Sequence, residues 1–245
     1  MRSSRRYEDI FRNMIGIGVV LICLLTVYSD FMIRKENFSG QDESTGPVYF
    51  ILTSSIKDMN DDERKEKYLK GISSVLQYTK DMPNCKVILV ENNGKRPTYL
   101  DGLGIDVFYT NNNTLGLEKG STEMKDILDC IEKYKIRDND FIVKMTARYK
   151  LDTSSPFMDE VSKLKSNTDC IIRYGSYDKL DGDKNDCITG LIGMRCEHIK
   201  RIKMNVPFIE HEWAAVANSI DSEKVIAMKQ LGVYICPGYN SYFLV

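Results

Sequence analysis

The chain has 245 residues, with 34 lysines and arginines against 35 aspartates and glutamates, so its formal net charge is −1. This balance excludes a strongly basic nucleic-acid-binding protein, and the 16 glycines and 6 prolines are too few for a collagen-like or low-complexity chain. A chain of this length forms one large domain or two small ones, with a core that needs no disulfide or metal.

The N-terminal region predicts a membrane anchor. The uncharged apolar run 13–29, continued at 31–33, is preceded by Arg2, Arg5, Arg6 and Arg12. A membrane-spanning helix needs roughly 17–25 such residues. A cleaved signal peptide is the alternative, and it is disfavoured because no alanine occurs before Ala147. The basic flank predicts a cytoplasmic N-terminus and therefore a single-pass type II membrane protein.

The sequence predicts four successive segments. Residues 1–13 form a cytoplasmic tail, 14–33 the transmembrane signal anchor, 34–47 a polar, turn-rich stem and 48–245 the globular domain.

Apart from Cys23 in the predicted anchor, all of the 7 cysteines lie in the globular domain. Their spacing contains no C-x-x-C pair, which argues against a structural zinc site. The even number outside the anchor is compatible with disulfides, whose pairing the spacing does not fix. Because several of these cysteines lie in apolar, strand-like runs, buried thiols are the simpler interpretation.

Strand and helix patterns alternate along the globular domain. Apolar runs predict strands at 48–53, 85–90, 105–109, 141–145, 170–174, 188–194 and 233–236. Apolar residues at helical spacing predict helices at 63–80, 119–134, 156–164 and 213–219. This alternation predicts an α/β fold with an open, mostly parallel sheet and helices on both faces.

Polar clusters follow four of the predicted strands. They are Thr53-Ser54-Ser55, Glu91-Asn92-Asn93, Asn111-Asn112-Asn113 and Thr146-Ala147-Arg148-Tyr149. Each cluster alone is compatible with a simple turn. Because the carboxyl ends of parallel strands share one edge of the sheet, the clusters together predict a binding site there.

Several common site motifs are absent from the sequence. No G-x-G-x-x-G follows the first strand, and no phosphate-binding P-loop, G-x-S-x-G or H-E-x-x-H occurs. These absences exclude the usual dinucleotide, P-loop nucleotide, serine-hydrolase and zinc-protease signatures.

Four segments together resemble the small glycosyltransferases of the GT-A fold, which use nucleotide sugars. They are the first strand with its Thr-Ser-Ser end, 115–120 leading into a helix, 141–149, and 189–193 followed later by 208–213. The resemblance covers about 48–240 and implies that the domain 48–245 is catalytic. The anchor and stem resemble the layout of secretory-pathway glycosyltransferases.

The resemblance implies transfer of a sugar from a nucleotide-sugar donor to a glycan, glycoprotein or glycolipid acceptor. Such a reaction needs a nucleotide pocket, positive charge or a metal at the departing diphosphate, and a base for the acceptor hydroxyl if configuration inverts. The resemblance also implies location in a Golgi or other secretory membrane. A bacterial inner membrane and a virus-encoded protein of a host membrane are the alternatives.

The implied donor site lies at the strand ends and at one helix start. Its nucleotide part would contain Thr53, Ser54, Glu91 and Asn92. Lys119 and Gly120 open a predicted helix, where free backbone N–H groups suit phosphate.

The sequence departs from the GT-A pattern at the metal site. Most GT-A enzymes carry Asp-x-Asp after the fourth strand, whereas this chain has Lys144, Thr146 and Arg148 in that region. We therefore expect Lys144 or Arg148 to hold the diphosphate without a metal, the alternative being that Arg148 pairs with a structural carboxylate. Asp181 and Asp183 are the alternative, as ligands for Mn²⁺ or Mg²⁺. The segment that contains them is also typical of a surface loop.

The implied acceptor side contains Thr189 and Gly190 and the cluster Glu210, His211 and Glu212. Glu210 is the preferred base. Glu212 lies two positions later and points elsewhere on a helix, and His211 lies between the two carboxylates. The alternative is a helix start at which the macrodipole favours acidic residues.

Two other functions remain compatible with the sequence. One is a catalytically inactive GT-A-like domain that binds sugar or a partner enzyme. The other is a nucleotidyltransferase, which the predicted anchor disfavours because its nucleoside triphosphates are cytosolic.

Overall fold

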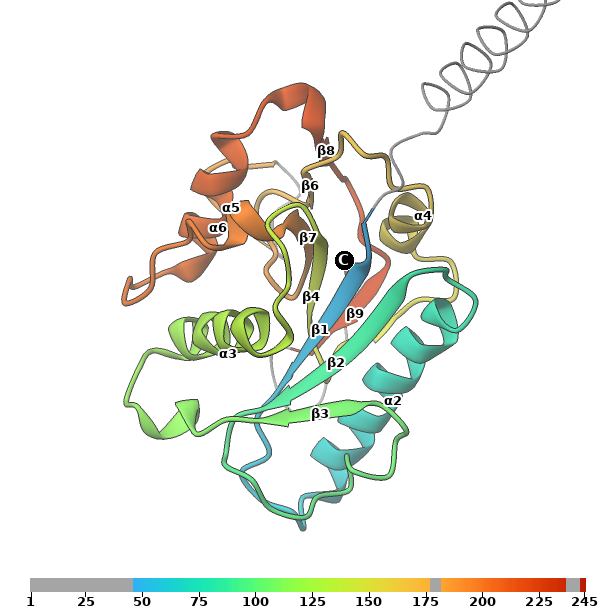
Figure 1. The fold of residues 1–245 in the computed structure, drawn as a ribbon, viewed down its shortest axis with the longest axis vertical. Coiled ribbons are helices and arrows are strands. Elements are labelled where there is room, and N and C mark those ends of the chain that lie inside the picture. Colours follow the sequence, from blue (N-terminus) through green and yellow to red (C-terminus); the bar gives the residue numbers. More distant parts are fainter. Residues whose placement is uncertain (1–45, 177–181, 237–242) are drawn as a thin grey trace, which may run out of the picture. The chain divides into compact units, whose positions relative to one another are not determined.

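The computed structural model describes residues 46–176, 182–236 and 243–245 (Figure 1). The predicted tail and anchor, nearly all of the stem, and Asp181 lie outside these residues. Within the described ranges, no helix is both long enough and apolar enough to cross a membrane.

The central element is a seven-stranded sheet with the order β3-β2-β1-β4-β7-β6-β8. Its strands are β1 Val48–Ser54, β2 Cys85–Glu91, β3 Asp106–Tyr109, β4 Phe141–Thr146, β6 Cys170–Ile172, β7 Leu191–Arg195 and β8 Val225–Ala227. Strands β1 to β4 are parallel, and β7 runs antiparallel to both of its neighbours. The predicted open, mostly parallel sheet is confirmed.

Helices cover both faces of this sheet (Figure 1). They are α2 Asp62–Thr79, α3 Lys119–Tyr134, α4 Pro156–Ser162, α5 Cys196–Ile199 and α6 Ile209–Asn218, with short 3₁₀ turns at η1 Asn112–Thr114 and η2 Ser222–Lys224. Helices α2 and α4 pack on one face, and α3, α5 and α6 pack on the other. The two-layer covering explains why the strands read as continuous apolar runs.

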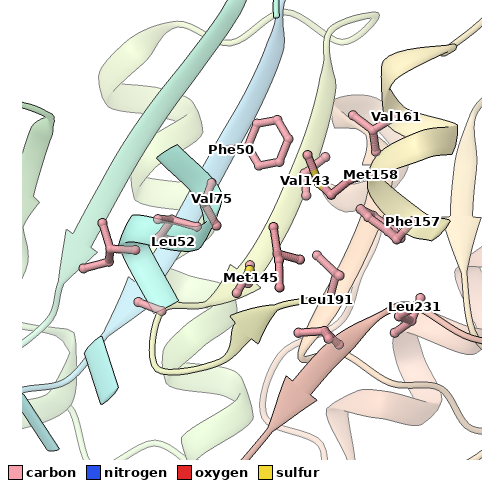
Figure 2. Close-up of a cluster of buried hydrophobic side chains, with 14 of the residues drawn as sticks. Phe50, Leu52, Val75, Val143, Met145, Phe157, Met158, Val161, Leu191 and Leu231 are labelled. Atoms are coloured by element: carbon pink, nitrogen blue, oxygen red, sulfur yellow. The ribbon is translucent and has the colours of Figure 1, made fainter. Parts of the chain in front are cut away.

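Successive residues of β1 point into two different cores. Phe50 and Leu52 belong to the core under α2 and α4, whereas Ile51 belongs to the core under α3 and α6. Figure 2 shows the first core, in which Phe50 of β1 lies near Val143 of β4, and Phe157 of α4 belongs to the same cluster.

A second, three-stranded sheet consists of β5 Lys150–Leu151, β9 Val233–Ile235 and β10 Phe243–Leu244 in the order β10-β9-β5. Only its β9 strand is predicted from the sequence, because two-residue strands leave no periodic signal.

Gly71 brings helix α2 against the segment that follows β4. A Cβ atom at this position would lie 2.1 Å from the carbonyl oxygen of Ala147 and 2.4 Å from that of Tyr149. Only glycine permits this approach, which fixes the segment that carries Arg148.

The cysteines described by the structure carry free thiols, and all except the partly exposed Cys85 are buried. Buried thiols are therefore the correct interpretation of Cys130, Cys170, Cys187, Cys196 and Cys236.

Candidate functional site

A cleft of about 360 Å³ lies at the carboxyl edge of the parallel strands. It is lined by Thr53, Ser54, Ser55, Lys57, Arg64, Tyr68, Asn92, Asn113, Leu117, Lys119, Thr122, Glu123 and Arg148. Each of the four polar strand-end clusters contributes to this lining. The four clusters lie together because β3, β2, β1 and β4 are parallel neighbours, so that their carboxyl ends lie at the same edge of the sheet.

Glu123 of helix α3 is the carboxylate at the floor of the cleft. Its Oε1 atom accepts hydrogen bonds from Thr53 Oγ1 at 3.0 Å and Thr146 Oγ1 at 3.3 Å, and its Oε2 atom lies 3.0 Å from Lys144 Nζ. Burial by itself raises the pKa of Glu123, but the charge and hydrogen bond of Lys144 and the hydrogen bond from Thr53 outweigh it, so this pKa lies below its ordinary value. Glu123 is thus an ionised link between α3, β1 and β4.

Lys144 is buried and directs its ammonium group into the protein. Its Nζ atom donates to Glu123, to Thr146 Oγ1 at 3.2 Å and to the carbonyl oxygen of Thr189 at 2.6 Å. An ammonium group has three N–H donors, and all of them are used here. The expectation that Lys144 holds a diphosphate does not fit this geometry, and Thr146 is likewise committed to Glu123 and Lys144.

Glu91 is buried, and its carboxylate is likewise hydrogen-bonded to protein groups. Its carboxylate accepts hydrogen bonds from Ser54 Oγ at 2.7 Å, from the backbone N–H of Ile56 at 3.1 Å and from Asn93 Nδ2 at 3.0 Å. Although it was expected to bind the donor, Glu91 does not line the cleft. It holds the loop after β1 to the loop after β2.

Asp126 is a second buried carboxylate on α3, and it organises the other half of the strand edge. It accepts hydrogen bonds from Asn92 Nδ2 at 2.9 Å, Thr110 Oγ1 at 2.8 Å and Asn112 Nδ2 at 2.8 Å. Burial raises the pKa of Asp126 to about 6, although the three hydrogen bonds favour its ionised form. The Asn92 amide that lines the cleft is oriented by this contact.

Among the described residues, the cleft lining contains the cations Lys57, Arg64, Lys119 and Arg148 and one carboxylate, Glu123. Burial lowers the pKa of Lys119, and the positive charges of Arg148, Arg64 and Lys57 lower it further. These cations therefore lie close enough to repel one another. A concave surface of this kind attracts an anion.

Arg148 lies over the ring of Tyr149, with 5.2 Å between its Cζ atom and the ring centroid. In the part of the chain that the structure describes, no carboxylate lies within ion-pairing distance of Arg148. Arg64 donates to the carbonyl oxygen of Ser55 at 3.0 Å and lies over the ring of Tyr68, so it is held at the cleft wall.

Gly120 brings the start of α6 against the start of α3. A Cβ atom on Gly120 would lie 2.3 Å from a side-chain carbon of Ile209, the first residue of α6. This contact places the cluster Glu210, His211 and Glu212 beside the helix start that carries Lys119.

None of the three residues of this α6 cluster lines the cleft as it stands. Glu210 and Glu212 are partly exposed, and the exposed His211 ring lies 5.2 Å from the ring of Phe208. On the neighbouring loop, Gly190 leaves room for the ring of Tyr149, because a Cβ there would lie 2.4 Å from that ring.

The described residues contain no group of three or more His, Cys, Asp or Glu side chains that could hold a metal ion. Asp183 is exposed, and its Oδ1 atom accepts hydrogen bonds from the backbone and side-chain N–H groups of Asn185 at 2.9 and 3.0 Å, as in a turn. Asp181 lies outside the described residues.

Sequence reasoning missed Lys57, Arg64 and Glu123. Glu123 lies four positions after Lys119 on the same helical face, and this spacing was the available signal. Lys57 and Arg64 follow the first strand in a charged segment and carry no comparable signal.

No protein-family model and no curated protein matches the chain. Among solved structures, it is similar to a mannosyltransferase from Pyrobaculum calidifontis in complex with GDP-mannose and Mn²⁺, at 11% identity and a TM-score of 0.46 over 81% of this chain and 61% of that one. It is also similar to a glycosyltransferase involved in glycosylation of the major capsid of PBCV-1, at 11% identity and a TM-score of 0.42 over 74% of this chain and 81% of that one. A third similar structure is 4-diphosphocytidyl-2C-methyl-D-erythritol synthase, at 9% identity and a TM-score of 0.45 over 75% and 89%. These likenesses are too distant to assign an activity.

The buried pair formed by Lys144 and Glu123 predicts a large stability effect. Lys144→Met should lower the free energy of unfolding by about 3–5 kcal/mol, because the carboxylate loses its partner. The double variant Lys144→Met/Glu123→Gln should recover part of this loss. Lys150→Met, at an exposed position of β5, should have little effect. Urea unfolding measures all three, and an unchanged midpoint for Lys144→Met would contradict the pairing.

Asp126 predicts a pH-dependent contribution to stability. Because its pKa rises from 3.8 to about 6 on folding, the folded chain binds the proton more tightly than the unfolded chain. This group's contribution is therefore fully present below about pH 4, declines as pH rises towards 6 and is absent above that. Asp126→Asn should remove this decline. Urea unfolding between pH 4 and 7 measures the free energy of unfolding of the wild type and of Asp126→Asn. If this free energy changes with pH in the same way in both proteins, the assignment is refuted.

Proposed function

We propose that the chain is a glycosyltransferase that moves a sugar from a nucleoside-diphosphate sugar to a hydroxyl group of a glycan, glycoprotein or glycolipid. The observation that carries this proposal is the cationic cleft at the carboxyl edge of the sheet. Its cations are Lys57, Arg64, Lys119 and Arg148, and its one carboxylate already has an ion-pair partner. An elongated ligand with clustered negative charge and polar groups beside it fits such a cleft.

The cations suit the charge that develops when the donor reacts. The bond between the anomeric carbon and the phosphate oxygen breaks, and the diphosphate leaves with an additional negative charge. Lysine and arginine groups fixed around it stabilise that charge, and the planar guanidinium of Arg148 can bind two phosphate oxygens at once. We propose that these groups take the place of a divalent metal, so that Mn²⁺ or Mg²⁺ is not required.

The acceptor hydroxyl must lose a proton as its oxygen bonds to the anomeric carbon. We assign this proton to Glu210 in an inverting reaction. The assignment is supported by the contact between Gly120, which follows the cleft residue Lys119, and Ile209, which precedes Glu210. Thr189 and Gly190, which adjoin Lys144 and Tyr149, belong to the same acceptor side in this proposal.

The proposal extends to the N-terminal segment. The apolar run at 14–33 and its basic flank support a type II signal anchor, with 34–47 as stem and the catalytic domain across the membrane. A Golgi or other secretory membrane suits this arrangement.

One observation favours a second candidate, an inactive GT-A-like domain that binds sugar or a partner enzyme. Glu210 and Glu212 lie outside the cleft lining, and the one carboxylate that the described residues contribute to it, Glu123, is already paired with Lys144.

Donor binding is tested by calorimetry on the full-length chain in detergent, with uridine and guanosine diphosphates and inorganic pyrophosphate, in EDTA and in Mn²⁺. Arg148→Ala should weaken binding of pyrophosphate roughly 10- to 100-fold, the loss expected for a charge-assisted hydrogen bond. Lys150→Ala removes a nearby cation outside the cleft and should not change the affinity. If none of these anions binds, or if Arg148→Ala binds as the wild type does, the donor site is wrong. Binding that needs Mn²⁺ would reject the metal-free version.

Catalysis is tested by release of nucleoside diphosphate from a panel of nucleotide sugars. Glu210→Gln should keep the donor affinity and lower the release rate by about 100-fold or more, because the base is lost. Glu212→Gln is the matched control and should retain most activity. Full activity of Glu210→Gln would remove it as base, and donor binding without any turnover would favour the inactive-domain candidate.

A further inference from the structure

Glu123 of the cleft still has capacity to accept a hydrogen bond. A carboxylate offers about four acceptor positions, two on each oxygen. Thr53 and Thr146 occupy Oε1, and Lys144 occupies one position on Oε2. One position on Oε2 is left over, and 24% of the side chain is exposed in the cleft.

Lys144, the ion-pair partner of Glu123, differs from it because it has no bonding position left for a ligand. The ammonium group of Lys144 is 3% exposed and has no donor left, so the ion pair presents only its negative partner to a ligand. The cleft therefore combines outward cations with one acceptor held in place by three donors from the protein.

An ionised carboxylate repels phosphate, so Glu123 must face a part of the ligand that is neutral and can donate a hydrogen bond. In a nucleoside-diphosphate sugar, the neutral donors next to the phosphates are the hydroxyl groups of the ribose on one side and of the sugar on the other. Because a carboxylate with a lowered pKa is a weak base near neutral pH, binding suits Glu123 better than proton abstraction.

We propose that Glu123 is a specificity-determining residue that accepts a hydrogen bond from one hydroxyl group of the bound donor, on its ribose or its transferred sugar. This inference rests on the proposed function. It adds the residue that recognises a hydroxyl group of the donor. A ligand that lacks this hydroxyl leaves the carboxylate facing apolar atoms in a partly buried site, which is the situation that polar sites reject most strongly.

The test compares ligands that differ by one hydroxyl, using calorimetry on the full-length chain in detergent. The ribose arm compares uridine and guanosine diphosphates with their 2′-deoxy and 3′-deoxy analogues. The sugar arm compares nucleotide sugars with analogues that lack single sugar hydroxyls. One deletion should weaken binding about 10-fold or more, and the arm in which it occurs identifies the source.

Glu123→Gln connects the effect to this residue. In that variant the same hydroxyl deletion should cause no further loss. Pyrophosphate carries no hydroxyl, so its affinity should stay the same or rise when the negative charge is removed. If Glu123→Gln does not fold, Glu123→Asp keeps the charge beside Lys144 and withdraws the carboxylate from the ligand, and it should show the same loss of discrimination.

Two results would overturn the inference. One is an unchanged affinity for every hydroxyl deletion in both arms. The other is a hydroxyl-dependent loss that persists in a folded Glu123 variant. Failure of pyrophosphate and all nucleotides to bind the wild type would instead reject the proposed function, and this inference with it.

Discussion

A negative charge withdrawn from water is tolerated only where hydrogen bonds or a cation replace the lost water. Helix α3 carries two such carboxylates, three residues apart: the partly buried Glu123 and the buried Asp126. Glu123 collects donors from the ends of β1 and β4, and Asp126 collects donors that follow β2 and β3. The carboxyl ends of four strands are thereby tied to the first half of one helix. These polar contacts hold together the strand ends that line the cleft.

The same requirement separates two kinds of charged residue at the strand edge. In the first kind, neighbouring protein groups satisfy the hydrogen bonding of the charged group, as they do for Lys144, Glu91 and Asp126. Lys57, Lys119 and Arg148 line the cleft, and burial and the nearby positive charges make it costly for Lys119 to keep its proton. An anion in the cleft would relieve that repulsion, so the cleft favours anionic ligands.

Close backbone contacts add a second, steric level of control. Gly71 allows α2 to touch the carbonyl groups around Arg148, and Gly120 allows α6 to touch α3. Gly190 makes room for the Tyr149 ring, on which Arg148 lies. Each of these glycines joins elements that are distant in the sequence, and Gly71 and Gly190 contact the residues on either side of Arg148 or the ring on which it lies.

The sequence alone determined the features that depend on local periodicity. Helix α3 begins and ends where the pattern of apolar residues predicts, at Lys119 and Tyr134, and the mostly parallel sheet follows from the alternation of strands and helices. The convergence of the four polar clusters could also be predicted, because parallel order places their strand ends on one edge.

Only the tertiary structure decided which charges face the cleft. Glu123 meets Thr53 across 70 positions and Lys144 across 21 positions of the chain, and such partners leave no periodic signal. Lys144 and Arg148 look equally suited to bind phosphate in the sequence. Lys144 belongs to a strand that is buried throughout, whereas Arg148 follows that strand in a partly exposed segment. Because burying a charge without partners is costly, Lys144 is paired with the Glu123 carboxylate, whereas Arg148 lies in the lining of the cleft.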